Sequence, residues 1–132
     1  MRARFQEHLQ RGVELFNRQE FYEAHEVWEA AWAEELSDDR LLLQGLIQVA
    51  AGFYKLQTGS PQGTVKLLLA GERKLQPFRP RAHGVEVEAL LSEVARWREE
   101  AARLSAANRR DYDPALLPRI HFRPSPLGRG EG

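Results

Sequence analysis

Residues able to do chemistry are concentrated in one short segment, FYEAHEVWEAAW, at residues 21–32. Within it Glu29 follows His25 by four residues, so a helix with about 100° per residue places both side chains on the same side. An imidazole and a carboxylate placed in this way can hydrogen-bond to each other or share a metal ion. The spacing therefore predicts a His–Glu pair, with Glu26 at its edge.

Three aromatic residues surround this pair in helical projection: Tyr22, Trp28 and Trp32. The projection places His25 beside the tryptophans instead of among the solvated glutamates. Aromatic side chains at helical spacing most often belong to a core, but such a stripe is also able to line a groove for a ligand. Both interpretations remain open at the level of sequence.

A second segment, LLLQGLIQVAAGFYKL at residues 41–56, carries a matching polar stripe. Gln44, Gln48 and Lys55 lie within about 40° of each other on a helix. If this stripe faces the His–Glu pair, the polar groups meet in a mostly apolar interior, where unpaired polar atoms are costly. We expect such a cluster to be fully hydrogen-bonded or to hold a ligand.

The elements that must position these residues are amphipathic helices, indicated by apolar residues at spacings of three and four. The expected helices are residues 3–17, 21–35, 37–56, 60–75 and 85–106. Residues 37–39 supply capping oxygens for the third helix. Ser60 is the expected N-cap of the fourth helix, and Pro61 lies in its first turn. The third is apolar nearly all round yet shorter than the ~20 apolar residues that span a bilayer, so we expect it to be the buried central helix.

The end of the chain is rich in proline, which excludes a regular helix or a central strand there. Its prolines are Pro114, Pro118, Pro124 and Pro126, and its candidate docking residues are Leu116, Leu117, Ile120 and Phe122. We expect residues 113–122 to pack on the bundle and the last few residues to be loose. The predicted fold is all-α: a compact bundle of about five helices in residues 1–107, followed by an irregular tail in residues 108–132 that is partly docked.

Composition restricts the classes of function. The chain has 132 residues, 19 basic and 19 acidic residues and no cysteine. One soluble domain is expected, with no disulfide, thiolate nucleophile or cysteine zinc site, and the balanced charge argues against partners that are nucleic acids or membranes. Residues 1–16 carry charges throughout and lack the apolar stretch of a signal peptide, so a cytoplasmic protein is expected. The excess of arginine over lysine is reported for some heat-stable families and makes this a possible thermostable protein.

Charge is less even along the chain. Residues 19–39 contain eight acids and no lysine or arginine, whereas residues 66–110 contain ten bases and six acids. We expect the acidic second helix to pack against the arginine-rich fifth helix and otherwise to be solvated.

Two motifs in these helices resemble a known family. The first comprises His25, Glu26, Trp28, Glu29 and Trp32, and the second is Gln-Gly-Leu-Ile-Gln at residues 44–48. Together, over roughly Phe16 to Leu75, they resemble the small helical proteins catalogued as domain of unknown function 309. The resemblance implies an all-helical bundle. It brings no demonstrated activity, although such proteins are sometimes described as predicted metal-dependent hydrolases.

In the hydrolase interpretation, His25 and Glu29 are catalytic and hold a divalent metal ion together with Glu26, and a metal-bound water attacks the substrate. The motif lacks the second histidine of a zincin, because that position is Glu29. Further ligands would have to come from His8, His83 or His121.

Two other interpretations need no metal. In the first, the chain binds an unknown protein or small-molecule ligand through a groove lined by Tyr22, Trp28, Trp32, Gln44 and Gln48. In the second, the cluster is purely structural: Glu29 and a glutamine satisfy both ring nitrogens of His25 and hold the second and third helices in register. The oligomeric state and the substrate or partner are not readable from the sequence.

Overall fold

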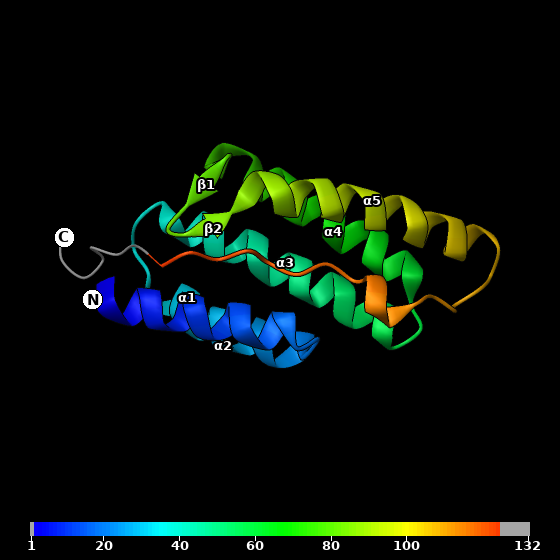
Figure 1. The fold of residues 1–132 in the computed structure, drawn as a ribbon, viewed down its shortest axis with the longest axis horizontal. Coiled ribbons are helices and arrows are strands. Elements are labelled where there is room, and N and C mark those ends of the chain that lie inside the picture. The colour runs from blue at the N-terminus through cyan, green and yellow to red at the C-terminus, as the bar shows by residue number, and fades with distance from the viewer. Residues whose placement is uncertain (1, 125–132) are drawn as a thin grey trace.

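The computed structural model describes residues 2–124, which form five α-helices joined by short connections (Figure 1). The helices are α1 (Arg2–Asn17), α2 (Phe21–Glu34), α3 (Asp39–Gln57), α4 (Pro61–Leu75) and α5 (Val87–Ala106). Two short 3₁₀ helices, η1 (Gln76–Phe78) and η2 (Pro114–Leu116), and two strands, β1 (Arg81–Ala82) and β2 (Val85–Glu86), complete the described part. The all-α prediction is confirmed.

The β-hairpin accounts for an error of two residues in the predicted start of the fifth helix. Val85 and Glu86 were expected to begin the fifth helix, but they pair antiparallel with Ala82 and Arg81. Gly84 lies between the strands with φ of +89°, a backbone conformation that glycine adopts without strain. Helix α5 therefore starts only at Val87.

Each helix packs mainly on its neighbour in the sequence, so α3 lies between the α1–α2 pair and the α4–α5 pair (Figure 1). Leu42, Leu46 and Phe53 of α3 are fully buried, which confirms the prediction of a central third helix. Within residues 2–124, no helix combines the length and the apolar character needed to cross a membrane.

Small residues let α3 and α4 approach closely. A Cβ atom added to Gly71 would lie 3.0 Å from the carbonyl oxygen of Gly45 and 2.8 Å from a methyl group of Val49. The buried hydroxyl of Thr64 donates a hydrogen bond across the same interface, to the carbonyl oxygen of Gly52 at 2.9 Å. These contacts fix α3 against α4 and leave its other flank to α2.

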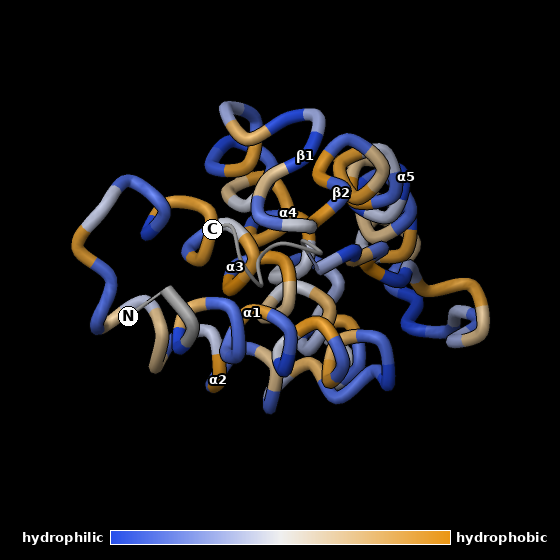
Figure 2. Tube along the Cα trace, turned by 60° about the vertical axis from the view of Figure 1, so that its left-hand side comes forward, coloured by the Kyte–Doolittle hydropathy of each residue, from blue (hydrophilic) through white to orange (hydrophobic). Residues whose placement is uncertain are grey.

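The arginine-rich helix does not neutralise the acidic one. Helix α5 packs on α4, whereas α2 packs on α1 and α3, and two views separate α2 from α5 (Figures 1 and 2). Arg98 of α5 forms its ion pair with Glu72 of α4, with Nε 2.6 Å from the carboxylate. The predicted packing of the second helix against the fifth is therefore wrong. Glu23 and Glu34 on the outer face of α2 are exposed, as expected. Glu26 and Glu29, which were expected at the polar cluster between the helices, are exposed as well.

The tail packs on the bundle through both its backbone and its side chains. The Asn17 side chain donates to the carbonyl oxygen of Ile120 at 3.0 Å and accepts from the Ile120 amide at 2.7 Å. Phe122 forms a bridge with Val85, so the tail extends the hairpin. Leu117 and Ile120 of the tail are buried, whereas Leu116 is 58% exposed. The expectation for the last residues falls on positions 125–132, outside the described residues.

Candidate functional site

Trp28 anchors the inner side of α2 to α1. The residue is fully buried, and its indole N–H donates to the carbonyl oxygen of Leu9 at 3.2 Å. The ring lies against Gly12, where an added Cβ would be only 2.0 Å from Nε1. Trp28 is thus a core residue with a satisfied polar atom, in contrast to its predicted place in a ligand groove.

The other flank of α2 packs on α3, and two aromatic contacts set the register. At one end, the rings of Tyr22 and Tyr54 lie 5.3 Å apart. At the other end, the guanidinium of Arg40 lies 4.1 Å from the ring centroid of Trp32, and Nε–H of Arg40 donates to the carbonyl oxygen of Trp32 at 3.2 Å. The two helices therefore run antiparallel, and Arg40 occupies one face of the Trp32 ring.

This register places the two predicted polar stripes at the same level along the helix pair. Between the two aromatic contacts, α2 carries His25 and Glu29 while α3 carries Gln44 and Gln48. Nevertheless, among the described residues no hydrogen bond joins His25 to either glutamine. The expected polar network between the helices is therefore incomplete.

The His–Glu pair itself is present. Nε2 of His25 lies 3.5 Å from a carboxylate oxygen of Glu29, and the two side chains are 22% and 54% exposed. The imidazole also stacks on Tyr22, with ring centroids 5.7 Å apart and an interplanar angle of 29°. His25 thus connects the tyrosine side of the cluster to the carboxylate side.

Glu26 interacts with Tyr22 instead of joining the His–Glu pair. A hydrogen bond between the two side chains, reinforced by the negative charge of Glu26, raises the pKa of Tyr22. The phenol is held in its neutral form because ionisation would place two negative charges side by side. We use the term aromatic–acid patch for the five residues so connected: Tyr22, His25, Glu26, Glu29 and Tyr54.

Two buried polar atoms on these two helices lack hydrogen-bond partners. They are Nδ1 of His25 on α2 and Oε1 of Gln48 on α3. The structural interpretation predicted a partner for each ring nitrogen of His25. Nε2 contacts Glu29, whereas Nδ1 has no partner. A buried polar atom without a partner costs about 1–3 kcal/mol, so the patch retains unused hydrogen-bonding capacity.

Both motifs lie within one recognised domain. Residues 9–67 match the family model described as Domain of unknown function (DUF309). Over this segment, 59 of the 132 residues, the chain is similar to the DUF309 family. The match includes the whole of α2 and α3, and hence every residue of the aromatic–acid patch. No protein in the curated collection matches the chain.

The residues of the His–Glu motif do not fit the metal ion that the hydrolase interpretation requires. Across residues 2–124, no three His, Asp or Glu side chains come together in an arrangement able to hold a metal ion. His25 and Glu29 approach each other, but Glu26 bonds to Tyr22. A catalytic role for His25 and Glu29 stays a prediction.

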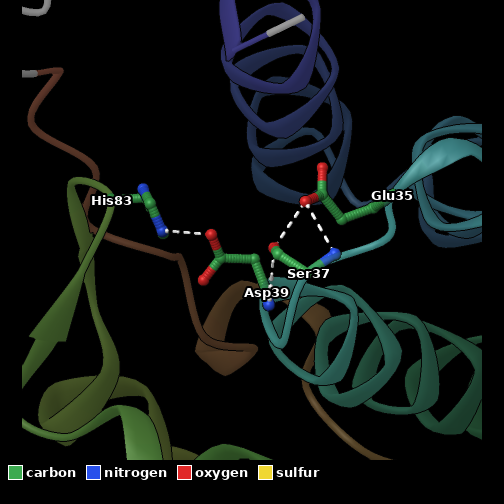
Figure 3. Close-up of polar contacts among 4 residues, drawn as sticks. All are labelled: Glu35, Ser37, Asp39 and His83. Carbon is green, nitrogen blue, oxygen red and sulfur yellow. Dashed lines mark hydrogen bonds and ion pairs between the residues drawn. The ribbon is translucent and has the colours of Figure 1, made fainter.

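The histidines proposed as further ligands serve other contacts or lie elsewhere. Nε2 of His83 lies 3.0 Å from the carboxylate of Asp39, whose backbone N–H donates to the Ser37 hydroxyl oxygen at 3.1 Å (Figure 3). The Ser37 hydroxyl in turn donates to Glu35 at 2.5 Å, so it belongs to a turn just before α3. His8 belongs to α1 and His121 to the tail.

Tyr54 is the member of the patch that the sequence analysis missed. It is 38% exposed and contacts Tyr22 across the helix interface. The available signal was a large aromatic residue near the polar end of an otherwise apolar helix. Helical projection alone did not reveal it, because the side of α3 that packs on α2 was not known.

Proposed function

We propose that this chain is a binding module whose aromatic–acid patch receives a cationic side chain, arginine or lysine, from a partner protein. The observation that carries the proposal is the pairing of two partly exposed tyrosines with two exposed carboxylates on a single face. Each component attracts a cation by a different mechanism.

The tyrosines supply the aromatic part. Tyr22 is 45% exposed and Tyr54 is 38% exposed, whereas six of the twelve aromatic residues are buried. An arginine or lysine cation over such a ring gains about 0.5–1 kcal/mol at an exposed site. Solvent exposure of adjacent tyrosines is a common property of protein-binding surfaces.

The carboxylates supply the charge. Glu26 and Glu29 are exposed beside the tyrosines, and α2 contains no lysine or arginine. Because the surrounding segment 19–39 carries eight acids, a cationic partner is drawn to this side of a protein whose formal net charge is zero.

The patch is built on rigid elements. Trp28 fixes α2 to α1, and the contacts of Tyr22 with Tyr54 and of Trp32 with Arg40 fix α2 to α3. Groups held in place before binding lose little conformational entropy when the partner arrives. This preorganisation favours binding of the partner to the aromatic–acid patch without a conformational change.

The proposal is tested by titrating ¹⁵N-labelled protein with a blocked glycine peptide that contains two arginines. We expect amide shifts centred on Tyr22 and Tyr54, and about threefold to tenfold weaker binding for Tyr22→Ala and for Glu29→Gln. Glu23→Gln is the matched control, because Glu23 is an exposed glutamate of the same helix outside the patch. Equal weakening by Glu23→Gln and Glu29→Gln would reduce the effect to net charge and overturn the proposed site.

A further inference from the structure

The connection between α5 and the docked part of the tail differs from the other connections of the bundle. Residues 106–111 are all exposed, and they form the longest run of exposed residues between positions 4 and 124. In Figure 1 this connection is the loop beyond the C-terminal end of α5. It lies outside the segment that matches the DUF309 model.

The backbone of the connection is held only where it leaves the helix. The N–H groups of Asn108 and Arg109 donate to carbonyl oxygens of α5 at 3.1 and 2.8 Å. From Arg110 to Ala115, no backbone N–H donates to a backbone carbonyl oxygen of a described residue. A protease binds its substrate in an extended form, and exposed segments without such hydrogen bonds are the preferred places for a cut.

Two consecutive arginines lie in this connection. Arg109 pairs with Asp111 at 2.6 Å, but the two side chains are 64% and 70% exposed. An ion pair this exposed contributes little, so Arg109 leaves it at small cost. The stem of Arg110 lies near Gly59, where an added Cβ would be 3.3 Å from its Cδ, and the residue is still exposed. Both side chains are therefore accessible to a protease whose specificity pocket selects a basic residue.

Other arginines outside the α-helices have a backbone that is held in place. The N–H groups of Arg18 and Gln19 donate to carbonyl oxygens at the end of α1. Arg81 is paired in β1. Arg119 precedes Ile120, which is 2% exposed and hydrogen-bonded through both its N–H and its carbonyl oxygen. A cut at any of these positions requires local unfolding first.

The contacts that dock the tail all lie beyond the two arginines. The Gln19 side chain donates to the carbonyl oxygen of Pro114 at 2.7 Å, and Asn17 bonds to Ile120 as described above. Nearer the end, the Arg123 N–H donates to the carbonyl oxygen of Gly84 at 2.7 Å. A cut after Arg109 or Arg110 breaks none of these bonds.

We infer that this connection is a processing site, where an endoprotease specific for arginine cleaves the bond after Arg109 or Arg110 while the tail stays docked. Water adds across the peptide bond, so the bundle gains a new carboxylate and the tail gains a new amine. The tail then becomes a separate peptide that is held by Asn17, Gln19 and the hairpin. The inference does not depend on the aromatic–acid patch, since the two sites share no residue.

Trypsin in a small amount, added to the full chain in native buffer, is the probe, and mass spectrometry identifies the cuts. We compare bonds between positions 5 and 124, because the ends of most chains are cut easily. The cut after Arg109 or Arg110 should be at least about tenfold faster than a cut after any other arginine or lysine in this range. A first cut elsewhere in the range would overturn the inference.

Paired substitutions separate this site from general loss of arginine. Arg109→Gln combined with Arg110→Gln should slow the first cut between positions 5 and 124 by about tenfold or more. The matched control combines Arg96→Gln with Arg103→Gln, which removes two exposed arginines of α5. The control should be cut as fast as the unmodified protein. Equal rates for the two double variants would contradict the inference.

Retention of the tail is measured by gel filtration of the cut protein. In native buffer the tail fragment should elute with the bundle, and in urea the two should separate. Asn17→Ala should weaken retention, whereas Gln10→Ala, at an exposed position of the same helix, should not. A tail fragment that elutes alone from the cut, unmodified protein in native buffer would overturn the claim that the tail stays docked.

Discussion

The two sides of α2 use similar residue types for different purposes. Toward α1, Trp28 is fully buried and its indole N–H is hydrogen-bonded to the Leu9 carbonyl oxygen. Toward α3, His25 has one enclosed nitrogen without a partner and stacks on a partly exposed tyrosine. The comparison teaches that the motif divides into a part that stabilises the fold and a part that retains binding capacity.

Truncation of the buried side should have the largest effect. We expect Trp28→Ala to lower the free energy of unfolding by about 3–5 kcal/mol, because it leaves a cavity and an unpaired carbonyl oxygen. Tyr22→Ala should cost less than about 1 kcal/mol, since its ring is nearly half exposed. Urea unfolding of both variants provides the measurement. Similar losses for the two would remove the distinction between the two sides.

Adding a methyl group next to the tryptophan should have the next largest effect. A Cβ at position 12 would collide with the indole ring, so Gly12→Ala should destabilise the protein by about 1–3 kcal/mol. The control is Gly63→Ala in α4, where the nearest atoms belong to the flexible Lys55 and to Ser60. That change should be neutral or stabilising by up to about 1 kcal/mol. Thermal unfolding of both proteins tests the contrast, which fails if Gly12→Ala is as stable as Gly63→Ala.

His25 should matter less for stability than its place in the motif suggests. His25→Leu loses a partly exposed contact with Glu29 but also removes an enclosed nitrogen without a partner. These effects oppose each other, so the free energy of unfolding should change by less than about 1 kcal/mol. A loss of several kcal/mol in urea unfolding would support the structural interpretation of the motif instead.

The smallest effect concerns titration of the patch. Because the Glu26 carboxylate raises the pKa of Tyr22, this hydrogen bond adds stability below the ordinary tyrosine pKa of 10.0. That stability is lost as the pH rises through the higher pKa of the folded state. Glu26→Gln should lower the pKa of Tyr22 toward its ordinary value, as measured by ¹³C NMR of the tyrosine ring. Glu23→Gln should leave it unchanged, and a shift of equal size there would point to net charge alone.

Much of the fold could be predicted from the sequence, because helical spacing reports burial directly. Leu42, Leu46 and Phe53 gave α3 its apolar character, and all three are fully buried. The hairpin at Val85 was not predicted, since a two-residue strand has no periodicity of its own and Val85 also suits a helix. Leu116 was predicted to dock because hydrophobicity does not specify which leucine of a proline-rich tail faces outward.

The candidate site was predicted less completely, because its geometry depends on which helices are neighbours. The i to i+4 spacing correctly placed His25 beside Glu29. The same projection grouped Trp28 with Trp32, although one lies in the core and the other is covered by Arg40 of α3. Local charge suggested that α2 packs on α5. The two helices are separated because each helix packs mainly on its neighbours in the sequence.

The most direct measurement compares the affinity of the unmodified protein for two blocked peptides that differ only in arginine and citrulline. Citrulline keeps the shape and several N–H donors of arginine but lacks its charge. If the flank of α2 that packs on α3 recognises a cation, the arginine peptide binds about tenfold more tightly and shifts the signals of Tyr22 and Tyr54. Equal affinity for both peptides, or shifts confined to other helices, would contradict this assignment.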